Sequence, residues 1–234
     1  MRSTSSRMPE FSFIVSMGLR LVIGFIIFSI LLFLPAGTFD WPEAWAFLII
    51  LLIYAIALHF LIFKENATTL KSRQHYKPVF SIDTFILGLA GIFFVSMFIF
   101  MGLDVGQFQW TSPLVPALFK YLGFSTLVCS LIVFLLVLKE NAYLSRVIEV
   151  QEKQTLISTG PYAYVRHPMY LGNVLFVLSL PLALGSYVAL VPAVLFLVCF
   201  IPRILFEERI LIKKLEGYQA YMQQVRYRVI PKIW

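Results

Sequence analysis

Residues 158–173, with the sequence STGPYAYVRHPMYLGN, gather the chain's most chemically versatile side chains in one short segment. Gly160-Pro161 interrupts any regular element before it, whereas Pro168 suits the first turn of a helix, where its missing N–H costs nothing. A helix that begins there offers free backbone N–H groups and the positive end of its dipole to a ligand. Arg166 adds a planar cation suited to a carboxylate. The segment therefore has the parts of a site for a small charged ligand.

Aromatic side chains accompany these groups. Tyr162, Tyr164 and Tyr170 offer flat faces to an adenine ring or to a sulfonium cation. Gly172 lets a ligand or a neighbouring helix approach closely. In the alternative, structural interpretation, Tyr and Arg are ordinary anchors at a membrane boundary. That interpretation explains the order Arg-His-Pro-x-Tyr-x-Gly poorly.

A second polar cluster, residues 203–208, lies beyond a long apolar stretch. Arg203 and Glu207 are four residues apart, so they share one side of a helix, and Glu208 is adjacent. Two neighbouring carboxylates at the end of a membrane helix are costly unless they are paired or hydrated. They form either a solvated helix end with an Arg–Glu pair or a site that binds a cation or hydroxyls while Arg203 holds an anionic group.

Apolar and aromatic residues at near-helical spacing follow this cluster: Leu211, Leu215, Tyr218, Tyr221 and Val225. This spacing predicts one amphipathic helix that lies back on the bundle. Its outward-facing residues are expected to be Lys213, Lys214 and Glu216.

Three motifs occur in order at characteristic intervals. They are Gly160-Pro-Tyr-x-x-Val-Arg-His-Pro-x-Tyr-x-Gly172, Arg203-Ile-x-x-Glu-Glu-x-x-Leu211 and Tyr218-x-x-Tyr221-x-x-x-Val225. Together they resemble the C-terminal half of the isoprenylcysteine carboxyl methyltransferase family and its phospholipid methyltransferase relatives. The resemblance covers about residues 141–231 and is specific for the superfamily, but it leaves the substrate open.

The resemblance implies an integral-membrane methyltransferase whose S-adenosylmethionine lies in a cytoplasmic pocket closed by the C-terminal segment. In such an enzyme Arg203 would orient the acceptor, and Glu207 is the second candidate catalytic residue. No catalytic or structural metal is expected. The implied cofactor-binding residues are Gln154, Leu156, Ile157, Tyr162, Arg166, His167, Pro168, Met169, Tyr170, Glu208, Tyr218 and Tyr221.

Three positions depart from the family's pattern. Gln154 stands where a His is often seen, and Asn173 stands where an aromatic residue commonly follows the glycine. Leu215-Glu-Gly217 replaces a frequent Phe-Gly pair. These differences bear on the acceptor, which the resemblance implies to be lipidic or prenylated, more than on the cofactor.

The chemistry of the acceptor decides which residues a methyl transfer needs. A carboxylate acceptor needs no base, and Arg203 would aim it. An amine must lose a proton, and Glu207 or His167 is then a candidate base. Two other functions remain open: a nicotinamide-dependent membrane reductase of sterol-reductase-like architecture and a non-enzymatic membrane transport or assembly protein. The reductase would need a second nucleotide-phosphate site, and a transporter would carry paired polar groups at mid-membrane.

Composition places the chain in a membrane. Hydrophobic residues make up 60% and charged residues only 13% of the chain, against roughly 25% charged residues in soluble domains. The net charge of +7 is explained by loop charges that set orientation, so no nucleic-acid partner is expected. Cys129 and Cys199 lie in apolar runs and are predicted to be buried thiols. A cleavable signal peptide is not expected, because the first apolar run lacks a small-residue cleavage site.

The fold class predicted is an all-α integral membrane protein, a bundle of about six spans. The first four spans are expected near 13–34, 43–63, 80–101 and 117–138. The stretch 170–206 is too long for one span, so we expect a helical hairpin with its turn at Gly185-Ser186 and its first helix short or kinked by Pro181. One long tilted helix is the alternative. Residues 1–140 would form a four-span bundle and 141–234 the cofactor-binding catalytic region.

Loop charges alternate along the chain. The N-terminus, loops 64–78 and 139–168 and the C-terminal tail are basic, whereas loops 35–42 and 102–116 carry no Lys or Arg. This pattern predicts that both termini and both polar clusters are cytoplasmic. Arg20, inside the first span, is expected to snorkel to that interface or to pair within the bundle.

Overall fold

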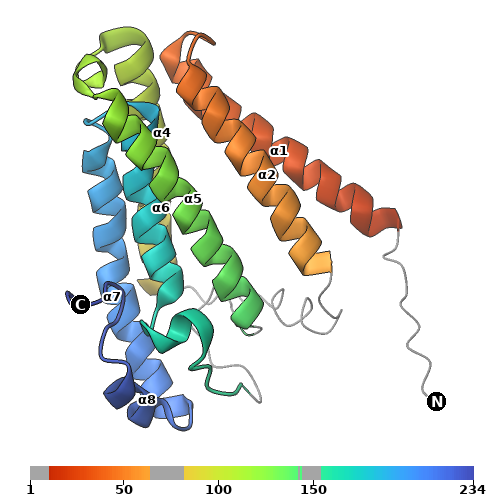
Figure 1. Ribbon diagram of the computed structural model, residues 1–234, viewed down its shortest axis with the longest axis vertical. Helices are drawn as coiled ribbons and strands as arrows, with labels where there is room; N and C mark the ends of the chain where they lie inside the picture. The colour runs from red at the N-terminus through yellow and green to blue at the C-terminus, as the bar shows by residue number, and fades with distance from the viewer. Residues whose placement is uncertain (1–10, 64–81, 142, 144–153) are drawn as a thin grey trace.

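The computed structural model describes residues 11–63, 82–141, 143 and 154–234, and all regular structure in these residues is helical (Figure 1). A π-helical turn, Leu103–Phe108, extends α4, and 3-10 turns lie at Ser112–Leu114 and Gly160–Ala163. The predicted all-α class is therefore confirmed over these residues. The helices are α1 (Phe11–Ala36), α2 (Pro42–Phe63), α4 (Ile82–Gly102), α5 (Ala117–Glu140), α6 (Pro168–Leu184), α7 (Leu190–Lys214) and α8 (Tyr218–Gln224).

Five segments are long and apolar enough to cross a bilayer, so the chain is a multi-pass membrane protein. They are Gly18–Ala36, Pro42–Leu61, Asp83–Phe108, Ala117–Glu140 and Leu190–Lys214. The sixth apolar helix, α6, has only 17 residues, which at 1.5 Å per residue makes it about 25 Å long. The prediction of about six spans thus corresponds to five long apolar helices and this shorter one.

The predicted hairpin is present in α6 and α7, which rules out a single long helix. The chain turns at Gly185, whose φ of +81° favours glycine, and the Ser186 N–H donates to the Pro181 carbonyl at 2.7 Å. Pro181 lies within the last turn of α6. The turn places the start of α6 and the end of α7 at the same end of the molecule (Figure 1).

A buried aspartate fixes the other end of this hairpin. Asp104, in the π-helical turn, accepts hydrogen bonds from the Ser186 hydroxyl at 2.6 Å and from the Thr111 N–H at 2.7 Å. The Thr111 hydroxyl accepts in turn from the Tyr187 N–H at 2.9 Å. These bonds join the hairpin turn to the end of α4, so α4, α6 and α7 are held in a defined arrangement.

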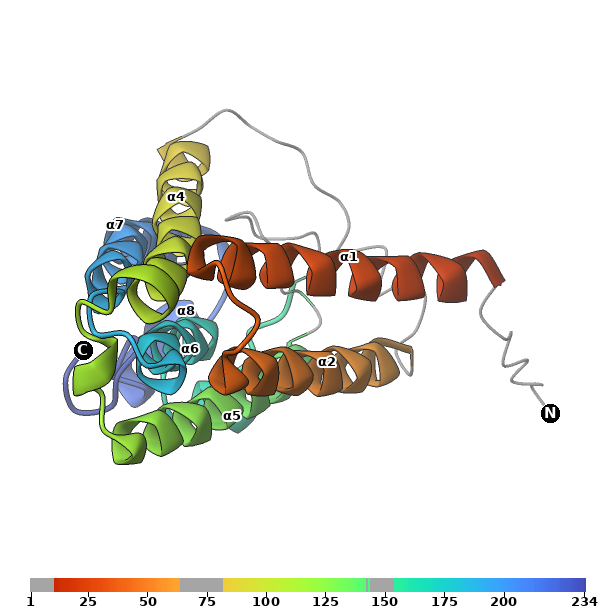
Figure 2. The same ribbon diagram turned by 90° about the horizontal axis from the view of Figure 1, so that it is seen from above.

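Small residues allow the helices to pack closely. A Cβ atom at Gly123 of α5 would overlap the backbone of Ala183 in α6, and one at Gly172 of α6 would come within 2.5 Å of the Phe134 ring in α5. Viewed from above, α1 and α2 run side by side and extend beyond the group formed by α4, α6 and α7 (Figure 2). The buried core between the helices includes Leu32, Phe47, Phe98, Leu127 and Leu180.

The C-terminal amphipathic helix differs from the prediction. Instead of one helix there are two, because α7 runs on to Lys214 and the chain then turns at Gly217, whose φ is +79°. The turn folds Tyr218 and Tyr221 of α8 back onto Leu156, where an uninterrupted helix would carry them away. As predicted, Lys213, Lys214 and Glu216 face outward.

Several sequence expectations concern residues outside those that the structure describes. Arg2, Arg7, loop 64–78 and most of the basic segment after α5 are among them, so the cytoplasmic orientation stays a prediction. Arg20 is exposed in the first half of α1. Cys199 is buried as expected, but Cys129 is exposed because it lies on the outward side of α5.

Candidate functional site

The start of α6 and the end of α7 lie side by side, and their polar residues make direct contacts. The Arg166 Nε donates to Glu208 Oε1 at 2.7 Å, and the Tyr170 hydroxyl donates to Glu207 Oε2 at 2.9 Å. His167 precedes Pro168, the first residue of α6, as the sequence predicts for a proline in a first turn. The structure thus brings together the two polar segments that the sequence separates by a full helical hairpin.

Glu208 is the centre of a buried ionic cluster. Its two oxygens accept from Arg166 Nε and from Arg228 Nε, each at 2.7 Å, and His167 Nε2 lies 3.4 Å from Oε1. The side chain is only 5% exposed. Because both oxygens are occupied by neighbouring side chains, Glu208 does not line the cavity described below, although the sequence resemblance places it among the cofactor-binding residues.

The C-terminal segment packs against this cluster and pairs with the start of α6. The backbone N–H groups of Arg166 and His167 donate to the carbonyls of Tyr227 and Arg228 at 2.9 and 2.8 Å. Arg166 Nη1 also donates to the Val225 carbonyl at 2.8 Å and to the Arg226 carbonyl at 2.7 Å. Arg166 and His167, at the start of α6, therefore hold residues 225–228 of the C-terminal segment against the hairpin.

A cavity of about 170 Å³ opens beside this cluster. Every residue of the predicted site except Glu208 lines it, so the sequence-based set converges in space. These residues are Gln154, Leu156, Ile157, Tyr162, Arg166, His167, Pro168, Met169, Tyr170, Arg203, Glu207, Tyr218 and Tyr221.

Sequence reasoning missed some of the lining. Asn141, Tyr143 and Asn173 contribute polar groups to the cavity wall, and Asn141 Nδ2 donates to the Tyr162 hydroxyl at 2.6 Å. Asn141 directly follows the apolar run of α5, which is the one sequence signal that it offers. Conversely, Tyr164 has no place in the lining, because its side chain is 75% exposed.

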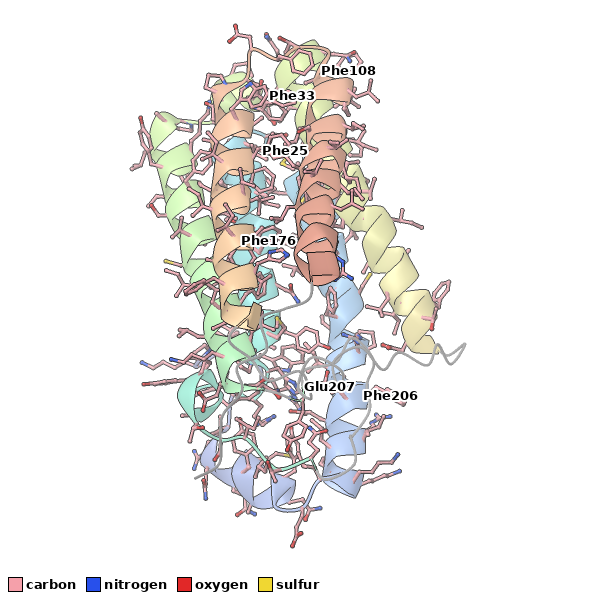
Figure 3. The ribbon with its side chains drawn as sticks, turned by 90° about the vertical axis from the view of Figure 1, so that its right-hand side faces the viewer. Phe25, Phe33, Phe108, Phe176, Phe206 and Glu207 are labelled. Atoms are coloured by element: carbon pink, nitrogen blue, oxygen red, sulfur yellow. The ribbon has the colours of Figure 1, made fainter. Side chains whose placement is uncertain are left out.

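Glu207 supplies the carboxylate of the cavity. Its side chain is 27% exposed, about five times as much as that of Glu208, and its Oε1 lies 3.8 Å from His167 Nδ1. Figure 3 shows Glu207 directed inward from α7, whereas the neighbouring Phe206 points outward. A half-exposed carboxylate beside an imidazole can bind a cation or accept a proton.

A chain of hydrogen bonds leads from Glu207 to another helix. The Tyr170 hydroxyl, which donates to Glu207, accepts from Arg203 Nη1 at 2.9 Å, and Arg203 Nε donates to Asp83 Oδ1 at 2.8 Å. Asp83 lies in the first turn of α4. Sequence reasoning did not single out this acidic residue, because nothing local to α4 indicates its partner on α7.

Three further tyrosines, Tyr162, Tyr218 and Tyr221, line the cavity. Burial raises the pKa of Tyr162 to about 12 and also raises the pKa values of Tyr218 and Tyr221, so all three hydroxyls are protonated at neutral pH. The Tyr221 hydroxyl donates to the Tyr162 carbonyl at 2.7 Å. The Tyr218 hydroxyl is buried without a hydrogen-bond partner in the described part of the chain. A ligand in the cavity can therefore satisfy it.

A second cavity of about 240 Å³ lies on the other side of Arg203, between α4 and α7. Arg203 borders both cavities. The remaining lining is mostly apolar and consists of Asp83, Ile86, Pro202, Leu205, Phe206 and Arg209. Over the residues described, no group of His, Cys, Asp and Glu side chains is arranged to hold a metal ion.

Comparison with known families bears out the resemblance seen in the sequence. Residues 118–217 match the model of a family described as phospholipid methyltransferase, which belongs with the isoprenylcysteine-type membrane methyltransferases. The matched segment begins in α5 and ends at Gly217, so it contains both polar segments and most of the cavity lining. A comparison with individual curated proteins found no match.

Proposed function

We propose that the protein is an S-adenosylmethionine-dependent methyltransferase that acts on a lipidic or prenylated acceptor at the membrane surface. The family match over residues 118–217 supports methyl transfer to a lipid. The observation that carries the proposal is the cavity beside Glu207, because it unites thirteen of the fourteen site residues that the resemblance implies. Its walls come from a membrane hairpin and from a polar C-terminal segment, which suits a lipid acceptor and a soluble cofactor.

The lining suits this cofactor. S-adenosylmethionine carries a cationic sulfonium, an amino-acid end, ribose hydroxyls and an adenine ring, and when bound it supplies an activated methyl group. Glu207 can attract its cationic groups, the tyrosine rings can stack on adenine, and the unpartnered Tyr218 hydroxyl can bond to a polar atom. The enclosed volume of about 170 Å³ is below the roughly 300–1,000 Å³ of small-molecule sites, so the ligand must also occupy the cavity mouth.

The protein's own contribution to such a reaction is chiefly orientation. An activated methyl group needs no nucleophilic side chain, and holding two reactants in line can lower the barrier by roughly 7–11 kcal/mol. Arg203, fixed by Tyr170 and Asp83, can aim a carboxylate acceptor. For an amine acceptor, Glu207 can take the released proton, with His167 as the neighbouring alternative.

The proposed arrangement has the cavity and both termini on the cytoplasmic side, as the alternation of loop charge favours. In the same proposal residues 141–234 form the cofactor-binding region and residues 1–140 form the bundle that supports it. The close packing of α5 on α6 gives a physical basis for that support.

Two measurements on purified full-length protein test the proposal. Equilibrium dialysis with labelled S-adenosylmethionine should show saturable binding, and incubation with a total lipid extract should transfer the label to the organic phase. An extract supplemented with a prenylcysteine or with an aminophospholipid separates carboxylate from amine acceptors. Binding of NADPH in place of S-adenosylmethionine would favour the reductase, and binding of neither would contradict both the methyltransferase and the reductase.

A further inference from the structure

Asp83 reaches the candidate site from outside the family-matched segment. It lies in the first turn of α4, and its side chain is 11% exposed. Its Oδ1 accepts from Arg203 Nε at 2.8 Å. α4 therefore places a carboxylate directly behind the arginine that borders both cavities.

The guanidinium of Arg203 is held in two directions. Nε donates to Asp83 on α4, and Nη1 donates to the Tyr170 hydroxyl on α6 at 2.9 Å. Because a guanidinium is planar, two bonds from different nitrogens to different helices fix its plane as well as its position. The same Tyr170 hydroxyl donates to Glu207 Oε2 at 2.9 Å, so the orientation of Arg203 is passed on to the cavity carboxylate.

Asp83 contributes to the charge balance of Arg203 in this arrangement. The Arg203 side chain is 11% exposed on a membrane helix, where an uncompensated cation is costly. The same network also connects Arg203 to the carboxylate of Glu207, through the Tyr170 hydroxyl. If Asp83 lost its charge, Arg203 would be drawn towards Glu207, and both groups would leave the positions that face the cavity.

We propose that Asp83 is a positioning residue for methyl transfer, which acts through Arg203 and Tyr170 on Glu207. This inference rests on the proposed function. It extends the reaction machinery to the N-terminal bundle, which carries none of the motifs. The hydrogen bond from Arg203 to Asp83 also couples α4 to the site, because a shift of the first turn of α4 would move Arg203.

The test compares Asp83→Asn with the full-length wild-type protein in the label-transfer assay. The amide keeps the size of the side chain but removes its charge. We expect kcat to fall by about 10–100-fold, the range seen when groups that orient a reactive side chain are changed. The dissociation constant of S-adenosylmethionine should rise by less than kcat falls, since Asp83 lies outside the first cavity and reaches its lining only through Arg203, Tyr170 and Glu207. Asp83→Glu keeps the charge but is one methylene longer, so its kcat should lie between those of the wild type and Asp83→Asn.

Asp40→Asn is the matched control, because Asp40 is an exposed carboxylate in the loop between α1 and α2. Its kcat and cofactor affinity should equal those of the wild type. A double-mutant comparison then tests whether Asp83 acts through Arg203. In an Arg203→Gln background, followed by single-turnover transfer, Asp83→Asn should lower the rate by no more than about twofold.

Two results would overturn the inference: a wild-type kcat in Asp83→Asn, or an equal loss from this change in both backgrounds. If Asp83→Asn does not fold, as its thermal melting would show, Asp83→Glu takes its place, and a wild-type kcat there is the contrary result. A wild-type protein that neither binds S-adenosylmethionine nor transfers its methyl group would instead refute the proposed function.

Discussion

Arg166 and Glu208 are joined by a buried ion pair of 2.7 Å that ties the start of α6 to the end of α7. Glu208 also accepts from Arg228, so the pair holds the C-terminal segment in place as well. Its neighbour Glu207 faces the cavity instead, since successive residues of an α-helix point about 100° apart. The two adjacent carboxylates thus divide between a structural and a ligand-facing position.

Replacing the buried carboxylate should destabilise the fold. Glu208→Gln would leave Arg166 and Arg228 without their shared anion, and breaking a buried ion pair from one side costs about 3–5 kcal/mol. Thermal melting of the purified protein should show a clear drop in midpoint. Glu216→Gln, at an exposed position just after α7, is the control and should change the free energy of unfolding by less than about 0.5 kcal/mol. Equal midpoints for both variants would contradict the structural role of Glu208.

Replacing Glu207, the carboxylate in the cavity, should lower the activity and leave the stability unchanged. Glu207→Gln keeps the size of the side chain and an acceptor for the Tyr170 hydroxyl, so the melting midpoint should stay near that of the wild type. Methyl transfer should fall by about 10²–10⁴-fold if Glu207 is the base for an amine acceptor. Label transfer to an aminophospholipid measures this directly. An undiminished rate would assign Glu207 no part in the reaction.

The sequence predicted the fold where the physical signal is local. Apolar runs long enough for a bilayer located the spans, Pro168 marked the start of α6, and Gly185 marked the hairpin turn. The break between α7 and α8 was missed, because Leu211 and Tyr218 have the same spacing whether the helix continues or turns back. The two conformations differ in the backbone of Leu215, which is extended, and of Gly217, whose φ is positive.

The site could be predicted only where the signal is local, and contacts between distant segments were missed. The motifs and the resemblance named thirteen of the residues that line the cavity, but they also placed Glu208 there, because the sequence does not show that its carboxylate has buried partners. One of its partners, Arg228, arrives from the C-terminal segment. Asp83 was invisible because its partner lies on a helix far along the chain.

Close packing of α5 on α6 should be sensitive to a single methyl group. Gly123→Ala would place a Cβ atom against the backbone of Ala183, which cannot rotate away as a side chain can. Overpacking of this kind costs about 1–3 kcal/mol, so the thermal midpoint should fall. Gly91→Ala is the matched control, because a Cβ atom there meets nothing within 4 Å and α4 stays helical. A common response of both variants would argue against the α5–α6 contact.

Alkaline pH should loosen the tyrosine wall of the cavity. The folded protein raises the pKa of Tyr162 from about 10 to about 12, so below pH 10 the hydroxyl is neutral in both folded and unfolded chains and stability is constant. Above pH 10 the unfolded chain loses its proton first, and the free energy of unfolding falls by up to about 1.4 kcal/mol per pH unit until the folded form also titrates. Thermal melting between about pH 10 and about pH 12 measures how steeply the free energy of unfolding falls with pH. Tyr162→Phe should reduce the slope, and the part that remains is due to Tyr218 and Tyr221, whose pKa values are also raised. Tyr164→Phe, at an exposed ring, should leave the slope unchanged.

The unpartnered hydroxyl of Tyr218 offers the most direct link between structure and cofactor. In the ligand-free protein Tyr218→Phe removes a buried polar atom without a partner, so stability should hold or rise, by up to about 1 kcal/mol. If a bound S-adenosylmethionine satisfies that hydroxyl, its dissociation constant should increase by about 2–10-fold, which corresponds to one hydrogen bond. Dialysis and thermal melting of the same preparation give both quantities.

Tyr221→Phe provides the contrast, because that hydroxyl already donates to the Tyr162 carbonyl. Its removal should lower the stability of the ligand-free protein by about 1 kcal/mol. Each variant lacks one oxygen atom of the wild-type protein. The melting midpoint should hold or rise in Tyr218→Phe and should fall in Tyr221→Phe. If Tyr218→Phe instead lowered stability as Tyr221→Phe does and left cofactor affinity unchanged, the Tyr218 hydroxyl would be a structural group and the cofactor would have to lie elsewhere in the cavity.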